Sequence, residues 1–414
     1  MKYITASQAA EKWKISQRRV QILCSEGRIS GVFKLGDNWA IPDNSEKPND
    51  GRTKKEKMKM HKFIDLFCGC GGFTQGFTQA GYHSLLGVDM WNDATTTYKH
   101  NFPTSEIIND DIANISTEEL LRAANVSASE VDGIIGGPPC QGFSISGKRL
   151  IDDPRNVLYK SFVEFVGEIQ PKFFVMENVP GLVSMAKGIV KDAVIDDFAS
   201  RGYNVSWKIL ASDDYGVPQH RRRVFFVGLN RDVFGKRFFE FPNPIEGEKI
   251  TCKDAISDLD FISDEVALPD EATYELPPVS DYQKRMRKDS EVLWNHVATI
   301  HNAKTKEIIA MVPDGGNYQS LPQELWDTRK VHIAWTRMDS TRPCFTIDTG
   351  HNHHFHYRAN RVPTARESAR IQSFPDKFRF LGIKTSQLKQ VGNAVPPLLA
   401  QALAEKIAKL LQEE

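Results

Sequence analysis

The sequence contains no uninterrupted run of about 18 apolar residues, which is the length that a membrane-spanning helix requires. Its first residues, MKYITASQAAEKW, also lack the apolar stretch and the small-residue cleavage site of a secretory signal. The six cysteines, at positions 24, 68, 70, 140, 252 and 344, have neither Cys-x-x-Cys spacing nor the density of a disulfide scaffold. We therefore expect a cytoplasmic protein with no membrane partner, in which a thiol is free for chemistry.

A net charge is also lacking, since 53 basic residues balance 53 acidic ones. The balance is uneven along the chain, because residues 1–62 hold 14 basic and 7 acidic residues and the remainder carries the opposite excess. A basic segment favours a nucleic-acid partner, whereas the mildly acidic remainder would have to gather positive charge locally. Arg221–Arg223 and the stretch Lys284–Lys288 are the candidates for that role.

The first 45 residues predict a small module of two helices and a hairpin. Thr5 and Gln8 have the spacing of a capping box, and Ser16 can cap a second helix that stops at Gly27. Residues 32–41 then alternate apolar and polar side chains around a glycine turn, which is typical of a two-stranded wing.

This segment resembles excisionase-type or winged helix-turn-helix modules, which implies DNA contacts by Arg18 and Arg19. A solvated helical appendage that docks another protein is the alternative. The polar, Lys-rich residues that follow have the composition of a linker.

From residue 62 onward, apolar strand, glycine turn and helix repeat. The β-rich runs are KFIDLF (62–67), HSLLGVD (83–89), VDGIIGG (131–137), KFFVMEN (172–178) and RVFFVG (223–228). This alternation predicts a parallel, doubly wound α/β sheet. Between about residues 240 and 360 the period is lost among prolines and aromatic side chains, which indicates an irregular inserted domain, and the tail from Gln387 returns to helical spacing.

We therefore expect five parts along the chain. They are a helix-turn-helix and wing module (1–45), a linker (46–61), a catalytic, cofactor-binding domain (62–240), a target-recognition region (241–362) and a C-terminal part that completes the catalytic domain (363–414).

Three successive strand ends carry residues suited to a nucleoside. DLFCGCGG (65–72) places a glycine turn directly after a strand, where backbone amides can approach a ligand. Asp89 follows the second strand, where a carboxylate can accept hydrogen bonds from ribose hydroxyls. Asp111 follows the third strand region, in a position to accept a hydrogen bond from an adenine amino group.

GGPPCQGFS (136–144) sets Cys140 after two prolines at the end of a central strand, which is a fixed position suited to a nucleophile. Taken alone, a cysteine is more often a small buried apolar residue. Glu177 ends the next apolar strand, and burial there would raise the pKa of its carboxyl and favour the protonated form.

Six ordered motifs resemble those of cytosine-C5 DNA methyltransferases of bacterial restriction-modification systems. They are DLFCGCGG (65–72), PCQGFS (139–144), ENVPG (177–181), QHRRR (219–223), RESARIQSFP (366–375) and GNAVPP (392–397). The resemblance covers about residues 63–410 and leaves only the N-terminal module outside it. It implies a Rossmann-like class I fold, S-adenosylmethionine as cofactor, a prokaryotic, nucleoid-associated enzyme, and double-stranded DNA as substrate.

The resemblance also implies a role for particular residues. Cys140 would be the nucleophile, Glu177 the acid, Arg223 the contact to the cytosine carbonyl, and Arg221 a residue that positions a phosphate or the catalytic loop. The cofactor contacts would be Phe67, Cys68, Gly69, Cys70, Gly72, Asp89, Met90, Asp111, Ile112, Pro139, Leu158, Asn393 and Val395. The family commonly has alanine at position 68 and glutamate at position 89, where this chain has Cys68 and the shorter Asp89.

Because the reacting ring is reached from its faces, we expect the target cytosine to be flipped out of the duplex. Gln141 and Ser144 are then candidates for DNA contacts, and residues 145–156 for a loop that closes over the DNA. The four histidines of HNHHFHY (351–357) match no common zinc framework, so no metal is expected.

Two other functions stay open at this stage. One is a cytosine-C5 methyltransferase that acts on transfer RNA, and the other is a DNA-binding transcriptional regulator with an autoregulatory methylase body. We further expect a monomer, with a cognate restriction endonuclease as an additional partner.

Overall fold

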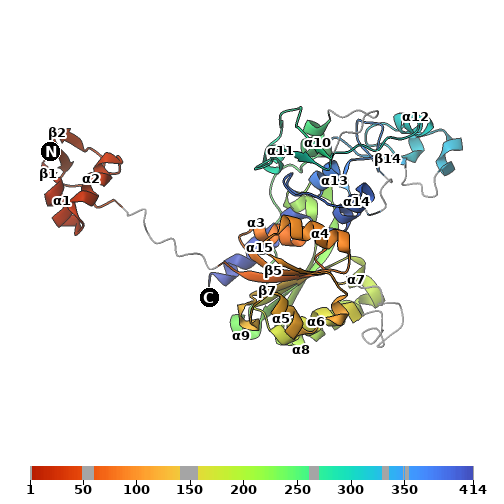
Figure 1. Ribbon diagram of the computed structural model, residues 1–414, viewed down its shortest axis with the longest axis horizontal. Helices are drawn as coiled ribbons and strands as arrows, with labels where there is room; N and C mark the ends of the chain where they lie inside the picture. Colours follow the sequence, from red (N-terminus) through yellow and green to blue (C-terminus); the bar gives the residue numbers. More distant parts are fainter. Residues whose placement is uncertain are drawn as a thin grey trace. The chain divides into compact units, whose positions relative to one another are not determined.

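The computed structural model describes residues 2–48, 60–139, 157–260, 270–328, 335–347, 349 and 354–413. The chain divides into two compact units, Met1–Lys59 and Met60–Glu414, and each is described by itself (Figure 1). Cys140, Gln141, Ser144 and the loop 145–156 lie outside the described residues, as does most of the expected linker. In the described part of the chain, no helix is long and apolar enough to cross a bilayer.

The first unit contains two helices and a small antiparallel sheet with strand order β1-β3-β2. Its elements are β1 (Tyr3–Thr5), α1 (Ala6–Trp13), α2 (Gln17–Ser25), β2 (Phe33–Leu35) and β3 (Asn38–Pro42). The predicted caps are confirmed, because Thr5 and Gln8 form a reciprocal capping box and the Ser16 side chain accepts from the Arg19 amide. Its own core includes Trp13, Leu23 and Ile41, which are buried.

The second unit is built on a seven-stranded sheet with order β6-β5-β4-β7-β8-β11-β9. The strands are β6 (Glu106–Ile108), β5 (His83–Val88), β4 (Lys62–Leu66), β7 (Gly133–Gly136), β8 (Phe173–Asn178), β11 (Arg222–Asn230) and β9 (Tyr203–Ala211). All five β-rich runs of the sequence are therefore strands of one sheet. The first five strands in this order pair in parallel.

The expectation of an entirely parallel sheet is wrong at one edge, where β11 runs antiparallel to both β8 and β9. The reason is the length of the connections. β9 is reached from β8 through α7 (Gly181–Ser184) and α8 (Ile189–Ser200), whereas only residues 212–221 join β9 to β11. A parallel crossover needs a dozen residues or more, usually with a helix, so this short connection reverses the chain direction.

Helices cover both faces of the sheet (Figure 1). One face carries α3 (Gly72–Gln79), α4 (Asn92–Asn101), α14 (Lys384–Asn393) and α15 (Pro397–Leu411), and the other carries α5 (Thr117–Ala123), α6 (Val157–Ile169) and α8. Consecutive strand residues serve opposite faces, as Phe173 and Phe174 do. Both faces of the sheet are thus buried, which explains why its strands have continuous apolar sequences.

The C-terminal helix α15 returns to pack on α3, the first helix of the sheet domain. A Cβ atom at Gly76 would lie 2.4 Å from both the Ala400 Cβ and the Pro397 carbonyl oxygen. Since real Cβ contacts are never so short, this approach of the two helices requires a glycine at position 76. The last residues of the chain therefore complete the domain that begins with β4.

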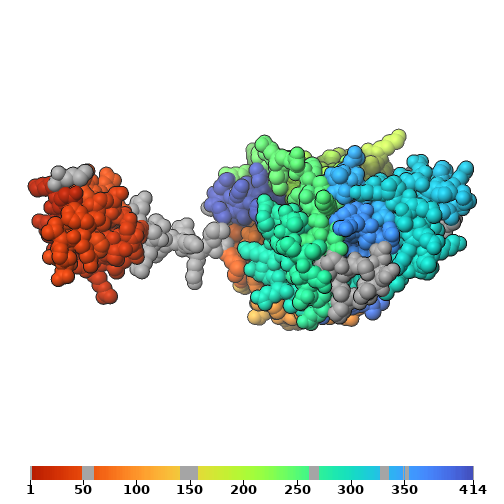
Figure 2. Space-filling model, turned by 90° about the horizontal axis from the view of Figure 1, so that it is seen from above, coloured from red at the N-terminus to blue at the C-terminus, as the bar shows by residue number. Residues whose placement is uncertain are grey.

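Residues 241–362 contain only short elements in their described part, and these form a large share of the face seen in Figure 2. They include α10 (Cys252–Ile256), β12 (Glu271–Ala272), α11 (Asp281–Met286), β13 (Leu293–Trp294), α12 (Ala303–Met311), β14 (Thr336–Arg337), β15 (Cys344–Phe345) and β16 (His354–Phe355), followed by α13 (Ala365–Ile371). β15 pairs with β10 (Gln219–His220), which ties this region to the sheet domain. A separate small core gathers around Ile309, Trp335 and Phe355.

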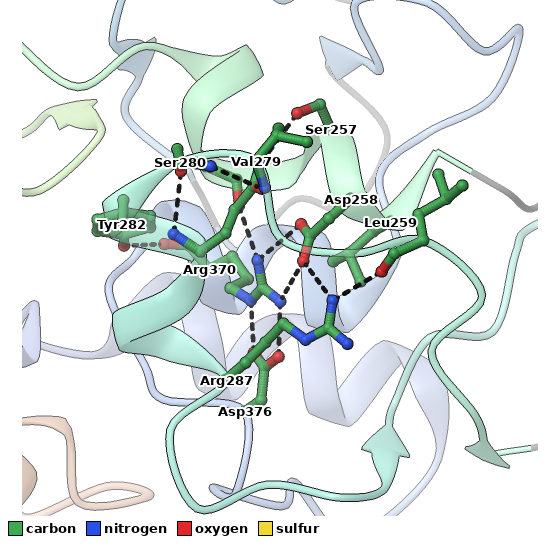
Figure 3. A network of polar contacts seen from close by, with 12 residues as sticks. Ser257, Asp258, Leu259, Val279, Ser280, Tyr282, Arg287, Arg370 and Asp376 are labelled. Atoms are coloured by element: carbon green, nitrogen blue, oxygen red, sulfur yellow. Dashed lines mark hydrogen bonds and ion pairs between the residues drawn. The ribbon is translucent and has the colours of Figure 1, made fainter.

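A buried ionic network holds α13 between this region and the chain that follows it (Figure 3). The guanidinium of Arg370 contacts Asp376 at 2.5 Å and Asp258 at 3.0 Å, and all three side chains are fully buried. Burial opposes the charge of Arg370, but Asp376 and Asp258 outweigh it and hold the pKa of Arg370 above its ordinary value. Arg287 adds a second contact to Asp258, at 3.3 Å.

We expected the stretch Lys284–Lys288 to supply positive charge to a DNA cleft, and the structure corrects part of this expectation. Arg287 is directed inward to Asp258, and Arg285 donates to the Gln401 side chain. Lys284 pairs with Asp281 on the surface of α11. The buried carboxylate of Asp258 thus has two cationic partners, Arg370 and Arg287.

Replacing Arg370 with leucine should leave two buried carboxylates without their shared cation. We expect the free energy of unfolding to fall by about 3–5 kcal/mol, measured by urea denaturation. Arg237→Ala is the control, because its partner Glu413 and Arg237 itself are each more than half exposed, and it should cost less than about 1 kcal/mol. Equal losses in the two variants would contradict the importance of the network.

Candidate active site

The turn after β4 has an unusual backbone that opens the N-terminus of α3 toward a cavity. Phe67 has a φ of 62°, in the left-handed region, and Gly69 and Gly71 have φ values of 52° and 97°. For a residue with a side chain this conformation costs on the order of 1–3 kcal/mol, and such strain is concentrated at functional sites. The motif DLFCGCGG thus forms a tight cradle between strand and helix.

The cavity has a volume of about 550 Å³ and lies at the carboxyl ends of β4, β5, β7 and β8. All thirteen residues that the sequence predicts as cofactor contacts line it: Phe67, Cys68, Gly69, Cys70, Gly72, Asp89, Met90, Asp111, Ile112, Pro139, Leu158, Asn393 and Val395. Its size is in the range of small-molecule sites. The structure brings these residues together, and their contacts to a ligand stay a prediction.

The C-terminal segment around Val395 packs against the glycine cradle and closes the cavity on that side. A Cβ atom at Gly72 would lie 2.5 Å from the Val395 carbonyl oxygen, so the close approach of this segment depends on the absence of a side chain. Apolar Phe67, Ile112 and Leu158 share the cavity with the carboxylates of Asp89 and Asp111. Apolar walls with a few polar anchors fit a nucleoside.

Asp89 anchors the cradle to the neighbouring strand. Its carboxylate accepts hydrogen bonds from the Gly69 amide at 2.9 Å and from the Trp91 amide at 2.8 Å, one on each oxygen. Burial raises the pKa of Asp89, and these amide donors oppose the rise. Each carboxylate oxygen has a second lone pair, so the group can also accept from a ligand.

The sequence prediction missed nine residues that line the cavity. They are Asp65, Phe73, Val88, Trp91, Asp110, Gly137, Lys389, Gln390 and Ala394. The Lys389 ammonium lies 4.7 Å from the centre of the Trp91 ring, a cation–π contact between α14 and the end of β5. Each missed residue lies within four positions of an expected contact, and that proximity was the available signal.

Glu177 is the penultimate residue of β8 and also lines the cavity. Its Oε1 atom pairs with Arg223 Nε at 2.9 Å, and a Cβ atom at Gly137 would lie 3.0 Å from its Oε2 atom. Burial raises the pKa of Glu177, although Arg223 and Arg221 act in the opposite direction. Asn178, which the sequence prediction also missed, donates to the Pro138 carbonyl at 2.8 Å and so fixes the chain just before Pro139.

Arg221 is placed differently from what a phosphate contact requires. The side chain is 3% exposed and donates to the carbonyls of Ile347 at 3.1 Å and Gly392 at 2.9 Å. Burial lowers the pKa of Arg221 to about 9, with Arg223 acting in the same direction. These contacts favour a structural role for Arg221, which joins segments around the site. The expectation that Arg221–Arg223 gather positive charge for DNA is therefore wrong for Arg221, because its side chain is buried.

The other predicted site residues are not among those that line the cavity. Arg18 and Arg19 belong to α2 of the first unit, where Arg18 is exposed and Arg19 is half-buried. In the histidine-rich segment, His354 stacks on Phe345 with ring centres 3.7 Å apart, and His356 contacts Asp260 at 3.1 Å. Among the residues that the structure describes, no three possible ligands gather around a metal position.

A mostly parallel sheet of this order, with helices on both faces and a glycine-lined cavity at its carboxyl edge, defines a class I S-adenosylmethionine-dependent methyltransferase fold. Residues 61–409 match the C-5 cytosine-specific DNA methylase family. The chain therefore belongs to this family: it is a DNA (cytosine-5) methyltransferase with S-adenosylmethionine as its cofactor.

Individual relatives agree with this assignment. The type II methyltransferase M.DdeI of Desulfomicrobium norvegicum is 43% identical over 372 residues, which cover 83% of this chain and 88% of the relative. M1.HphI of Haemophilus parahaemolyticus is 39% identical over 355 residues, covering 85% and 88%.

Solved structures share the fold. A DNA modification methyltransferase encoded within an E. coli prophage has a TM-score of 0.69 and 28% identity, over 85% of this chain and 99% of that one. Dnmt2 of S. pombe has a TM-score of 0.52 at 16% identity, over 85% and 99%, and this likeness concerns the fold alone.

Asp89→Ala should weaken binding of S-adenosylhomocysteine at least about tenfold in isothermal titration calorimetry, because a charged acceptor and the Gly69 tether are lost together. Asp89→Glu is the matched variant and should bind within a few-fold of the natural protein, since it keeps the carboxylate. Unchanged binding by the alanine variant would remove Asp89 from the cofactor site.

Proposed function

We propose that this enzyme methylates carbon 5 of a flipped-out cytosine in a specific double-stranded DNA sequence, through a temporary bond between the Cys140 sulfur and carbon 6. The observation that carries the proposal is that Glu177 lines the same cavity as the thirteen expected cofactor contacts, of which Pro139 is one. Cys140 follows Pro139 directly in the sequence. Methyl donor, acid and nucleophile would then meet around one base.

The need for a nucleophile follows from the substrate. Carbon 5 of cytosine is part of an aromatic, electron-poor ring and attacks a methyl group very slowly. When the Cys140 thiolate adds to carbon 6, a sulfur–carbon bond forms and carbon 5 becomes enamine-like. Bound S-adenosylmethionine supplies a methyl group on positively charged sulfur. The carbon 5 proton then passes to water or hydroxide, and its bonding electrons form the double bond between carbons 5 and 6. The sulfur–carbon bond breaks with its electrons returning to sulfur, which restores the aromatic ring and the thiolate.

Glu177 is suited to receive the electron density that addition pushes onto N3 of the ring. Its raised pKa favours the protonated carboxyl, which can donate a hydrogen bond to N3. Arg223 contacts Oε1, so it orients the carboxyl and leaves Oε2 as the oxygen that would carry the proton. The same guanidinium is the proposed contact to the cytosine carbonyl, which would link base binding to the position of the acid.

Target recognition is proposed for residues 241–362, and the β10–β15 pairing would hold this region beside the catalytic edge. The relatives M.DdeI and M1.HphI are named type II methyltransferases, which supports a role as the modification enzyme of a restriction-modification system. Their names also favour DNA over transfer RNA as substrate.

The first unit is proposed to be a winged helix-turn-helix that contacts DNA through α2. Its two capped helices and its β2–β3 hairpin support this geometry, with Arg18 on the outer side of α2 and Lys34 on the hairpin. Operator binding by this unit would make the protein an autoregulator in addition to a methylase. That second function is favoured by the separate core of the unit.

Cys140→Ala should abolish methyl transfer to duplex DNA and leave binding of S-adenosylhomocysteine within about twofold, because the cavity lining is unchanged. A duplex with 5-fluorocytosine at the target site, which bisulfite sequencing identifies first, should form a stable adduct with the natural protein and none with the variant. Turnover by the variant would contradict covalent catalysis, and labelled methyl groups in transfer RNA alone would contradict the DNA assignment.

Removing residues 1–60 should leave DNA methylation intact, because the second unit contains the complete cavity. In the full chain, Arg18→Ala with Arg19→Ala should reduce the slope of log K against log salt for DNA binding by about 1–2, as phosphate contacts are lost. The control is Lys12→Ala, because the Lys12 ammonium contacts Asp43. This variant should keep the slope of the natural protein. An unchanged slope in the double variant would exclude α2 as a DNA contact.

A further inference from the structure

A chain of buried hydroxyl groups leads from the floor of the cavity to the edge of the sheet. Thr74 donates to Asp65 Oδ2 at 2.6 Å, and the Tyr98 hydroxyl lies 3.1 Å from Thr74 Oγ1. Ser84 Oγ is 2.7 Å from the Tyr98 hydroxyl and 2.9 Å from Ser105 Oγ. None of these five side chains is more than 3% exposed.

The chain is built into the fold around Tyr98. A Cβ atom at Gly87 would lie 2.8 Å from the Tyr98 ring, and one at Gly71 would lie 3.0 Å from it. Two glycines therefore make room for this tyrosine between α4 and β5. The arrangement places its hydroxyl between Thr74 and Ser84, and the ring itself packs on Phe102 at a centre distance of 4.8 Å.

The direction of the protons follows from the chemistry of the groups. When Asp65 is ionised, its carboxylate accepts only, so the single proton of Thr74 is directed to Asp65. Tyr98 must then donate to Thr74, and Ser84 must donate to Tyr98. The dipoles of the Ser84, Tyr98 and Thr74 hydroxyls align toward Asp65 and polarise one another, which stabilises the anion, while the Ser105 hydroxyl also donates to the Glu106 carbonyl at 3.3 Å.

Asp65 has a second oxygen, Oδ1, that is buried and has no hydrogen-bond partner, and the residue lines the cavity. The titratable groups that act on it are Asp89, Cys68, Cys70 and Tyr98, none of which is cationic. Burial, with a contribution from Asp89, raises the pKa of Asp65 to about 8. An ionised Asp65 therefore benefits strongly from a positive charge that a ligand brings into the cavity.

We propose that the chain Thr74–Tyr98–Ser84–Ser105 is a specificity-determining network that holds Asp65 as the counter-charge to the sulfonium of S-adenosylmethionine. The product S-adenosylhomocysteine has a neutral sulfur, so the network favours the cofactor over the product and assists product release. This inference rests on the proposed placement of the cofactor in the cavity.

The test compares two tyrosine variants of the full-length protein by isothermal titration calorimetry with both ligands. Tyr98→Phe keeps the ring and removes the hydroxyl, so the dissociation constant for S-adenosylmethionine should rise about tenfold and that for S-adenosylhomocysteine less than about threefold. Tyr82→Phe is the matched control, because Tyr82 is also buried but donates to the Ala404 carbonyl at 3.2 Å. It should keep the ratio of the two constants found in the natural protein.

A second pair of variants tests whether loss of a hydroxyl group, and not misfolding, causes the change in binding. Thr74→Val should lower the preference for S-adenosylmethionine as Tyr98→Phe does, and Thr74→Ser, which keeps the hydroxyl, should restore it. An unchanged ratio of the two constants in Tyr98→Phe and Thr74→Val would overturn the inference. Asp89→Ala separates the two proposals. If Asp89→Ala weakens binding of both ligands while Tyr98→Phe keeps the ratio of the two constants, only the proposed role of the network is contradicted. If Asp89→Ala binds both ligands normally, the assignment of the cavity as the cofactor site is contradicted.

Discussion

The contact between the start of α3 and the C-terminal segment is the constraint on which the site depends. Gly72 faces the Val395 carbonyl and Gly76 faces Ala400, at separations that exclude any side chain. Because both glycines are in the first helix after the cradle, the segment 393–395 can lie directly over it and close the cavity. The cofactor cavity is thus shared by the first and last parts of the sheet domain.

Amide side chains reinforce this closure by joining motifs that are far apart in sequence. Gln219 hydrogen-bonds to Gln372, and Gln372 donates to the Ala394 carbonyl at 2.6 Å. Gln219 also accepts a hydrogen bond from the Ile347 amide at 2.8 Å. Arg221 donates to the carbonyl of the same residue, Ile347. Several residues of the family motifs therefore connect distant segments to one another. This structural role accounts for these residues without a contact to cofactor or DNA.

The features that the sequence predicted well are those with local causes. Strands with both faces buried have continuous apolar sequences, and Thr5 and Ser16 cap helices through bonds that span three residues. The thirteen cavity residues were found because parallel strands end at one edge and because the motifs resemble a known family. The reversed direction of β11 was missed, since it depends on a connection length that strand patterns do not reveal.

The features that escaped prediction depend on partners distant along the chain. The hydroxyl network joins Asp65 to Ser105 through three other elements, and Arg370 meets Asp258 across 112 residues. No local pattern marks a buried threonine or tyrosine as part of such a network. Arg221 illustrates the same limit, because its basic neighbours suggested a surface role, whereas it is buried and donates to the carbonyls of Ile347 and Gly392.

The packing of α15 on α3 has a consequence for synthesis. Until residues 397–411 have been made, the face of α3 that carries Gly72 and Gly76 has no cover, and the cavity is not closed. Domains form as units when their last element is available. A nascent chain therefore acquires its complete cofactor cavity only after residues 397–411 have been synthesised.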